Sequence, residues 1–118
     1  MALGLISCAD PSSLYDSAPL CDGAVRVTFS RDDATFDWAP ACGVTEGSVV
    51  GATGAVWSFE VSELRPLAPP LRYGQAPSGA VVREGPGALE AGRRYAIHVW
   101  ATVGRDVVVG GGSLEFDY

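Results

Sequence analysis

Residues 89–104, LEAGRRYAIHVWATVG, carry the clearest hydrophobic pattern in the chain. From Tyr95 to Ala101 every second residue is apolar, which is typical of a β-strand with one buried face. We therefore expect these odd-numbered side chains to face a core. The side chains expected to point the other way are Arg94, Ala96, His98, Trp100 and Thr102.

The composition favours a single all-β domain. The chain has 118 residues, of which 47% are hydrophobic, and this is enough for one core of ordinary size. Its 15 glycines and 8 prolines suit short strands joined by turns rather than long helices.

Charge and hydropathy argue against nucleic-acid binding and against a membrane-spanning helix. The formal net charge is −6 and all eight basic residues are arginine, which argues against binding to a nucleic-acid backbone. No apolar run approaches the roughly 20 residues that a helix needs to cross a bilayer.

The last part of the chain continues the pattern as a β-hairpin. With a turn at residues 104–106, the predicted facing pairs are Val103/Val107, Ala101/Val109, Ile97/Leu114 and Tyr95/Phe116. In the first two pairs the partner on the second strand is odd-numbered, whereas Leu114 and Phe116 are even-numbered. One extra residue must therefore be absorbed between 110 and 113, as in a β-bulge. We interpret the glycines there as structural; the alternative is a flexible ligand-binding loop.

A second alternating pattern lies between Cys21 and Cys42. Folding it about a polar turn at residues 30–33 predicts the facing pairs Phe29/Ala34, Val27/Phe36, Val25/Trp38 and Cys21/Cys42. Directly opposed residues of an antiparallel pair are within disulfide reach. We predict a disulfide worth on the order of 3 kcal/mol, typical of an oxidising compartment. The alternative is two buried free thiols in a cytosolic protein.

The middle of the chain predicts weaker strands. Residues 55–61 alternate as a half-buried strand, whereas the pattern of residues 44–50 is weak. The proline-rich residues 64–79 predict a crossover with a short strand at most, and residues 80–83 predict an edge strand.

Two motifs resemble a known family. Leu89, Gly92, Tyr95, Ile97, Val99 and Ala101 follow the order L-x-x-G-x-x-Y-x-I-x-V-x-A, and the segment FDWAP ends in Trp-x-Pro. These motifs resemble strands F and B of fibronectin type III and related immunoglobulin-like domains, over residues 23–118. The resemblance implies a two-sheet β-sandwich of about seven antiparallel strands, with Tyr95 as a tyrosine corner whose hydroxyl bonds backbone a few residues upstream. The cysteine pair departs from the inter-sheet bridge of antibody domains, and the fold specifies no function.

Leu5, Ile6, Ser7 and Cys8 resemble the lipobox of bacterial lipoproteins. In that family the cysteine receives a diacylglycerol and the chain is cut just before it. The resemblance implies lipidation at Cys8, with residues 1–7 the remnant of a signal peptide and residues 8–22 a tether. The basic start of a signal peptide is absent, and we interpret it as missing from this sequence. Three cysteines leave one outside a single bridge, which agrees with Cys8. The alternative is a frayed cytosolic N-terminus with a chance cysteine.

The residues offer little catalytic or metal chemistry. One histidine forms no His-rich metal site, and a chain without lysine has no P-loop. The serines lack the G-x-S-x-G elbow of hydrolases. Asp32 and Asp33 suit a solvated turn better than a calcium site. We therefore predict no enzyme activity, no metal and no cofactor.

The leading functional hypothesis is a non-catalytic binding or adhesion module of the bacterial cell envelope, anchored to a membrane by lipid at Cys8. His98 and Trp100, flanked by Arg94, form its candidate contact patch for an envelope protein or glycan, because one indole supplies much contact area at little entropy cost. The alternative for this patch is that it is only a wall of the fold.

The second functional hypothesis is a structural spacer or subunit of an envelope assembly, whose contacts run through sheet edges. In the lipoprotein family, an aspartate directly after the lipidated cysteine favours the inner membrane. Ala9 occupies that position here, which favours the outer membrane or the cell surface.

Overall fold

The computed structural model describes residues 18–104 and 106–118. Within this part of the chain it has nine strands and no helix. The strands are β1 (Gly23–Ala24), β2 (Arg26–Ser30), β3 (Thr35–Ala39), β4 (Glu46–Gly51), β5 (Gly54–Glu60), β6 (Leu71–Arg72), β7 (Val81–Glu84), β8 (Arg94–Val103) and β9 (Val107–Asp117).

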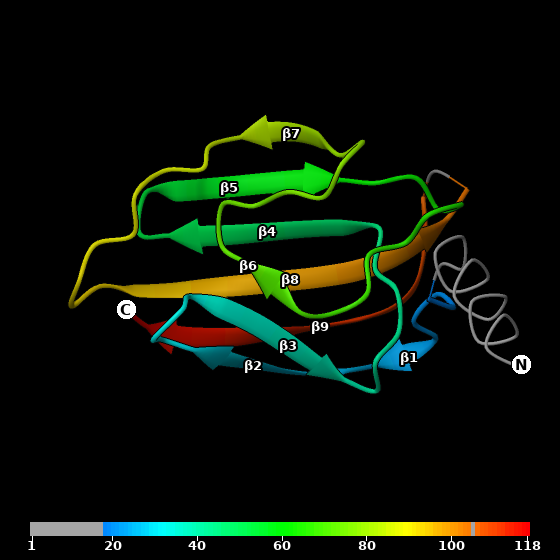
Figure 1. Ribbon diagram of the computed structural model, residues 1–118, viewed down its shortest axis with the longest axis horizontal. Helices are drawn as coiled ribbons and strands as arrows, with labels where there is room; N and C mark the ends of the chain where they lie inside the picture. Colours follow the sequence, from blue (N-terminus) through cyan, green and yellow to red (C-terminus); the bar gives the residue numbers. More distant parts are fainter. Residues whose placement is uncertain (1–17, 105) are drawn as a thin grey trace, which may run out of the picture.

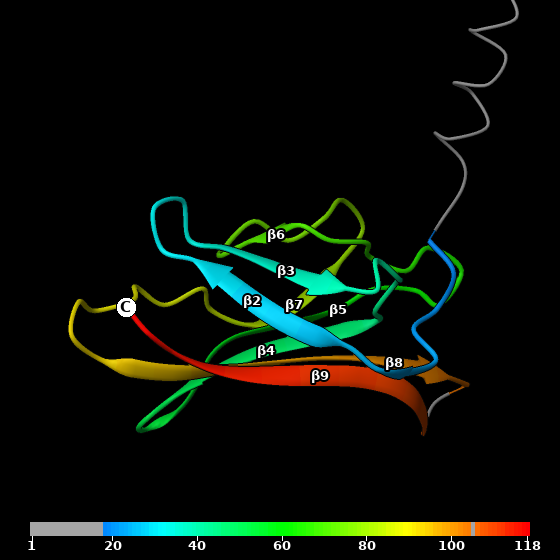
Figure 2. The same cartoon turned by 90° about the horizontal axis from the view of Figure 1, so that it is seen from below.

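The strands form two facing sheets (Figures 1 and 2). The larger sheet has the order β1-β9-β8-β4-β5-β7 and the smaller has the order β2-β3-β6. All named strand pairs are antiparallel except β1 and β9, which run parallel. The predictions of an all-β fold and of two sheets are confirmed. The strand count exceeds the expected seven because the described residues include the two-residue strands β1 and β6.

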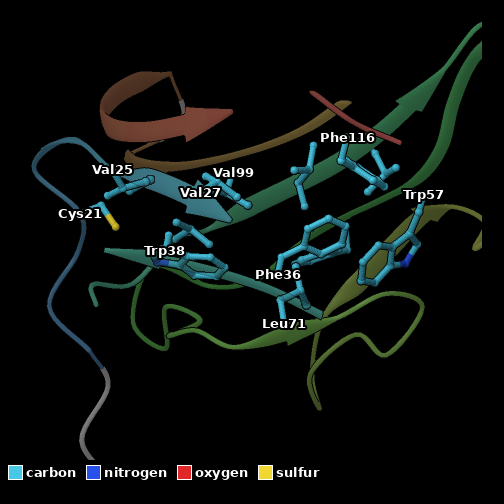
Figure 3. Close-up of a cluster of buried hydrophobic side chains, with 14 of the residues drawn as sticks. Cys21, Val25, Val27, Phe36, Trp38, Trp57, Leu71, Val99 and Phe116 are labelled. Atoms are coloured by element: carbon cyan, nitrogen blue, oxygen red, sulfur yellow. The ribbon is translucent and has the colours of Figure 1, made fainter. Parts of the chain in front are cut away.

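The core lies between the two sheets (Figure 3). Its largest buried side chains include Phe36, Trp38 and Leu71 from the smaller sheet and Trp57, Ile97 and Phe116 from the larger. The ring of Phe116 meets those of Phe29 and Phe36, with centroids 4.3 and 5.3 Å apart. This aromatic contact joins β9 to the β2–β3 hairpin across the core.

The crossover between β5 and β7 packs on β5. Tyr73 lies edge-on to Trp57, with ring centroids 5.1 Å apart, and its hydroxyl donates a hydrogen bond to the Gly87 carbonyl oxygen. Burial raises the pKa of Tyr73, with a further contribution from Tyr95. The predicted short strand of the crossover is β6, and the predicted edge strand is β7.

The β8–β9 ladder confirms most of the register predicted for it. The observed pairs include Val103/Val107, Ile97/Leu114 and Tyr95/Phe116. Ala101 pairs with Gly110 instead of Val109, because the extra residue of the bulge is Val109 itself. The parity change therefore exists, but it falls just before the glycines rather than among them.

Gly110 and Gly112 allow the N-terminal segment to cross close to β9. A Cβ atom on Gly110 would collide with the carbonyl oxygen of Cys21, and one on Gly112 with that of Val25. The two residues of β1 pair with Gly110 and Gly111 at this crossing. The glycines are structural, as predicted, but they are needed for the approach of another strand rather than for the bulge.

The β2–β3 hairpin has the predicted faces but a different register. Phe29 pairs with Phe36 and Val27 with Trp38, each two residues away from the prediction. The turn occupies residues 31–34, and Ala34, predicted to lie in the strand, has a φ of 51°. Because side chains alternate with a period of two, a slip of two residues keeps every side chain on its face.

The predicted disulfide is present between Cys21 and Cys42, whose Cα atoms are 4.9 Å apart. The premise that they are opposed in the hairpin ladder was wrong. Cys21 N–H donates to the Gly43 carbonyl oxygen, and Leu20 and Gly43 form an isolated parallel bridge beyond the hairpin. The indole N–H of Trp38 donates to the Cys42 carbonyl oxygen at 2.8 Å and holds this corner.

The packed part of the chain begins before the expected boundary of the tether. The carbonyl oxygen of Pro19 accepts a hydrogen bond from Gly43 N–H at 2.7 Å, and Cys21 is fully buried. Residues 19–21, which the sequence analysis assigned to the tether, thus belong to the fold. The predicted signal-peptide remnant at residues 1–7 and the predicted lipidation site Cys8 lie outside the described residues.

Candidate binding face

The outer face of the larger sheet points away from the smaller sheet (Figure 2). The strand register arranges its residues in rows across β9, β8, β4 and β5. One row holds Gly111, Trp100, Glu46 and Glu60, and the next holds Ser113, His98, Ser48 and Ser58. All eight residues are exposed or half-buried. We call His98, Trp100, Glu46, Ser48 and Ser113 the candidate binding face.

The sequence analysis singled out His98 and Trp100 but missed the three other members of this face. Glu46 and Ser48 lie on β4, whose weak hydrophobic pattern contained no information about its alignment with β8. Ser113 follows from the β8–β9 register, which places it directly opposite His98. That register was available in the sequence, so Ser113 is the one member that could have been found.

Trp100 borders a shallow hollow with a glycine floor. The hollow measures about 300 Å³ and is lined by His98, Val99, Trp100, Val108, Gly110, Gly111, Gly112 and Ser113. A Cβ atom on Gly111 would come within 2.9 Å of the Trp100 Cβ, so no larger residue fits opposite the indole. Trp100 is half-buried and His98 is exposed. An aromatic ring beside hydroxyl and imidazole groups can stack on a flat ligand and bond to its polar edge.

Arg94 does not belong to this face. It lies six residues before Trp100 on the same strand, which is roughly 20 Å along β8. Its Nε donates to Asp117 at 2.9 Å, and an Nη atom lies 3.7 Å from Glu115. The hydrogen bond from Arg94, followed by the charge of Arg94, lowers the pKa of Asp117 below its usual range. The guanidinium is therefore held by two carboxylates at the far end of the sheet.

Thr102 is buried, although the sequence predicts that it is exposed on the outer side with His98 and Trp100. It lines a hollow with Glu46 on that side but packs against the buried Thr45, so that both Ala101 and Thr102 are inaccessible. The Thr102 hydroxyl lies 3.0 Å from that of Thr45, and Thr102 N–H donates to the same oxygen at 3.0 Å.

A second hollow of about 500 Å³ lies beyond Thr102 and is mainly acidic. Its charged lining consists of Glu46, Glu60, Glu63 and Arg83. Arg83 pairs with Glu60, and Gly104 N–H donates to Glu63 at 2.9 Å. Within the residues that the structure describes, no three His, Cys, Asp or Glu side chains cluster closely enough to hold a metal ion.

Tyr95 lies on the opposite side of β8 from the candidate binding face. Its side chain is 7% exposed, and its hydroxyl oxygen accepts a hydrogen bond from Glu90 N–H at 2.9 Å. Its ring packs on Phe116 and fills the space beside Gly51. The contact ties the loop before β8 to the edge of the core.

Comparison of the chain with protein-family models, with curated proteins and with solved structures finds no match. The class of the protein is therefore defined by its own architecture, a two-sheet all-β fold with one disulfide. In the part of the chain that is described, no helix is long and apolar enough to cross a bilayer.

Proposed function

We propose that this chain is a non-catalytic binding or adhesion module of the bacterial cell envelope. It is an immunoglobulin-like domain of the fibronectin type III kind, held to a membrane by lipid at Cys8, with the outer membrane or cell surface as its location. It recognises an envelope protein or glycan through the candidate binding face and uses no cofactor.

The immunoglobulin-like assignment is supported by strand order and by Tyr95. The neighbours β9, β8, β4 and β5 form one sheet and β2, β3 and β6 the other, with the first strand running parallel to the last. Tyr95 packs inward and its hydroxyl bonds the backbone five residues upstream. This is the geometry of a tyrosine corner.

An exported, oxidising location is supported by the buried Cys21–Cys42 bridge. Such bridges persist in the periplasm and on cell surfaces and are rare in the cytosol. With both of these cysteines used, Cys8 is the one remaining thiol in the sequence. Mass spectrometry of the native full-length precursor, extracted from membranes, tests the anchor. Cleavage before Cys8 with an added lipid is expected, and an unmodified Cys8 in an uncut chain would contradict it.

The observation that carries the binding function is the open face around Trp100, where a half-buried indole lies beside a hollow with a glycine floor. Sheet edges support the spacer hypothesis less well. The edge strand β7 has four residues, contains a register shift against β5, and carries Arg83 and Glu84. Short, charged and irregular edges resist pairing with another chain.

The candidate binding face is tested by the substitution Trp100→Ala, with Arg94→Ala as the control on the same outer face. The probes are insoluble peptidoglycan and a panel of purified envelope polysaccharides. We expect Trp100→Ala to weaken capture at least about tenfold, since aromatic anchors dominate such contacts, while Arg94→Ala binds normally. A lower melting temperature with unchanged capture would mean that Trp100 is only a wall of the sheet.

A further inference from the structure

The exposed apolar side chains of the sandwich are concentrated at one end. In the described residues six large apolar side chains are exposed: Leu64, Val81, Val82, Val103, Val107 and Val108. Three of them flank the β8–β9 turn, with exposures of 42% for Val103, 60% for Val107 and 61% for Val108. We call these three side chains the valine tip. Val108 also lines the hollow beside Trp100, but none of the three side chains belongs to the core.

The loop after β5 adds to the valine tip. Gly104 N–H donates to the Glu63 carboxylate at 2.9 Å, which holds this loop against the β8–β9 turn. Leu64, the next residue, is 83% exposed. Charged residues of both signs also lie here: Glu63 and Asp106 are acidic, and the exposed Arg65 is basic. The end of the molecule is thus apolar with a charged rim.

The N-terminal segment joins the sandwich at this same end. Figures 1 and 2 both show the start of the described chain at the same end of the molecule as the β8–β9 turn, while the C-terminus lies at the opposite end. Gly23 pairs with Gly110, two residues from Val108. Cys8 precedes Ala18 by ten residues, which span at most about 36 Å when fully extended. Lipid at Cys8 therefore keeps the valine tip near the bilayer surface.

We infer that the valine tip is a membrane-contact surface, which dips into the bilayer to which Cys8 is anchored. The inference rests on the proposed anchor. Burial of valine side chains in hydrocarbon is favourable, and the tether raises their effective concentration at the surface. Because Glu63 and Arg65 carry opposite charges, the contact does not require anionic headgroups. The contact orients the long axis of the sandwich away from the membrane, with the C-terminal end outermost.

The test couples the full chain through its Cys8 thiol to phosphatidylcholine vesicles that contain a maleimide-headgroup lipid. Hydrogen exchange then compares the coupled chain with the same chain in solution. We expect exchange of the backbone amides at Val107 and Val108 to slow about tenfold on coupling, whereas the amides of the β4–β5 turn at the opposite end keep their rate.

The test variant combines Val107→Thr with Val108→Thr. Its control combines Val81→Thr with Val82→Thr on β7, where the two valines are also exposed but lie outside the tip. The test variant should abolish the slowing and the control should retain it. The inference is overturned if coupling leaves the tip amides unchanged, if the tip variant keeps the slowing, or if the slowing appears without vesicles as protein concentration rises, which indicates a second copy. Because the coupling is chemical, a native Cys8 without lipid would refute the anchor and leave this result interpretable.

Discussion

The β8–β9 and β2–β3 hairpins of this sandwich are held in different ways. β8 and β9 pair at ten positions, and β8 is also bonded to β4 along its other edge, so the ladder lies inside a continuous sheet. β2 and β3 pair at only five positions, and β3 has two paired positions with β6. The shorter hairpin ends instead at a disulfide and a buried indole hydrogen bond. An extended ladder thus stabilises the hairpin of the larger sheet, and a local covalent bond stabilises the hairpin of the smaller sheet.

The largest expected effect is on the β8–β9 side, where Gly112→Ala places a methyl group against the Val25 backbone. Because both partners are main chain, β1 and β9 must separate, and we expect a loss on the order of 4 kcal/mol in unfolding free energy. Gly87→Ala is the control, since its Cβ would meet the Val56 oxygen at an ordinary 3.5 Å. Urea unfolding measures both, and an equal loss in the two variants would contradict the close crossing.

A smaller effect is expected on the β2–β3 side when its covalent tie is removed. The double variant Cys21→Ala, Cys42→Ala opens a loop with a sequence separation of 21, and the expected loss is about 3 kcal/mol. The variant should retain its β-rich circular dichroism, since the ladders stay intact. Loss of the whole fold would show that the smaller sheet depends on the bridge rather than being strengthened by it.

The turn of the shorter hairpin offers a stabilising change. Ala34 has a φ of 51°, in the left-handed region that glycine adopts without strain. Ala34→Gly should raise the unfolding free energy by about 0.5 kcal/mol, because relief of strain slightly exceeds the added entropy of the unfolded chain. Ala52→Gly in the β4–β5 turn is the control and should be destabilising. Thermal unfolding that ranks the two variants the other way would contradict the turn geometry.

The smallest effect concerns the open end of the β8–β9 ladder, where Arg94 bonds to Asp117. The pKa of Asp117 is lowered in the folded state. Its contribution is therefore present above the unfolded pKa and is lost as the pH falls through the folded pKa. We expect Asp117→Asn to lower the melting temperature slightly at pH 7 and to match the original chain near pH 2. A difference that stays constant across this range would argue against the pair.

The sequence predicted which side chains of the two hairpins face the core, but it predicted the strand register of only one of them. In the β8–β9 hairpin the parity change before Leu114 demanded one extra residue, and this restricted the possible alignments. Between β2 and β3 no such irregularity exists, so alignments that differ by two residues bury the same side chains. The position of the turn determines which alignment forms, and an alanine at position 34 does not predict the left-handed conformation that this turn requires.

The candidate binding face was predictable only as far as a single strand determines it. Alternation placed His98 and Trp100 together and Tyr95 on the other side. Arg94 shared their parity, but its distance along β8 and its carboxylate partners remove it from the site. Thr102 was expected to be exposed but is buried against Thr45, and one strand's own pattern does not record a contact with another segment.

The parallel pair of β1 and β9 has a consequence for how the chain acquires its structure. The pair joins residue 23 to residue 110. The larger sheet is therefore incomplete until residues 110 and 111 have been synthesised. Long-range pairing of this kind slows folding, because distant segments must meet before their contacts form. The segment around Gly23 therefore lacks its partner strand while the residues between are being synthesised.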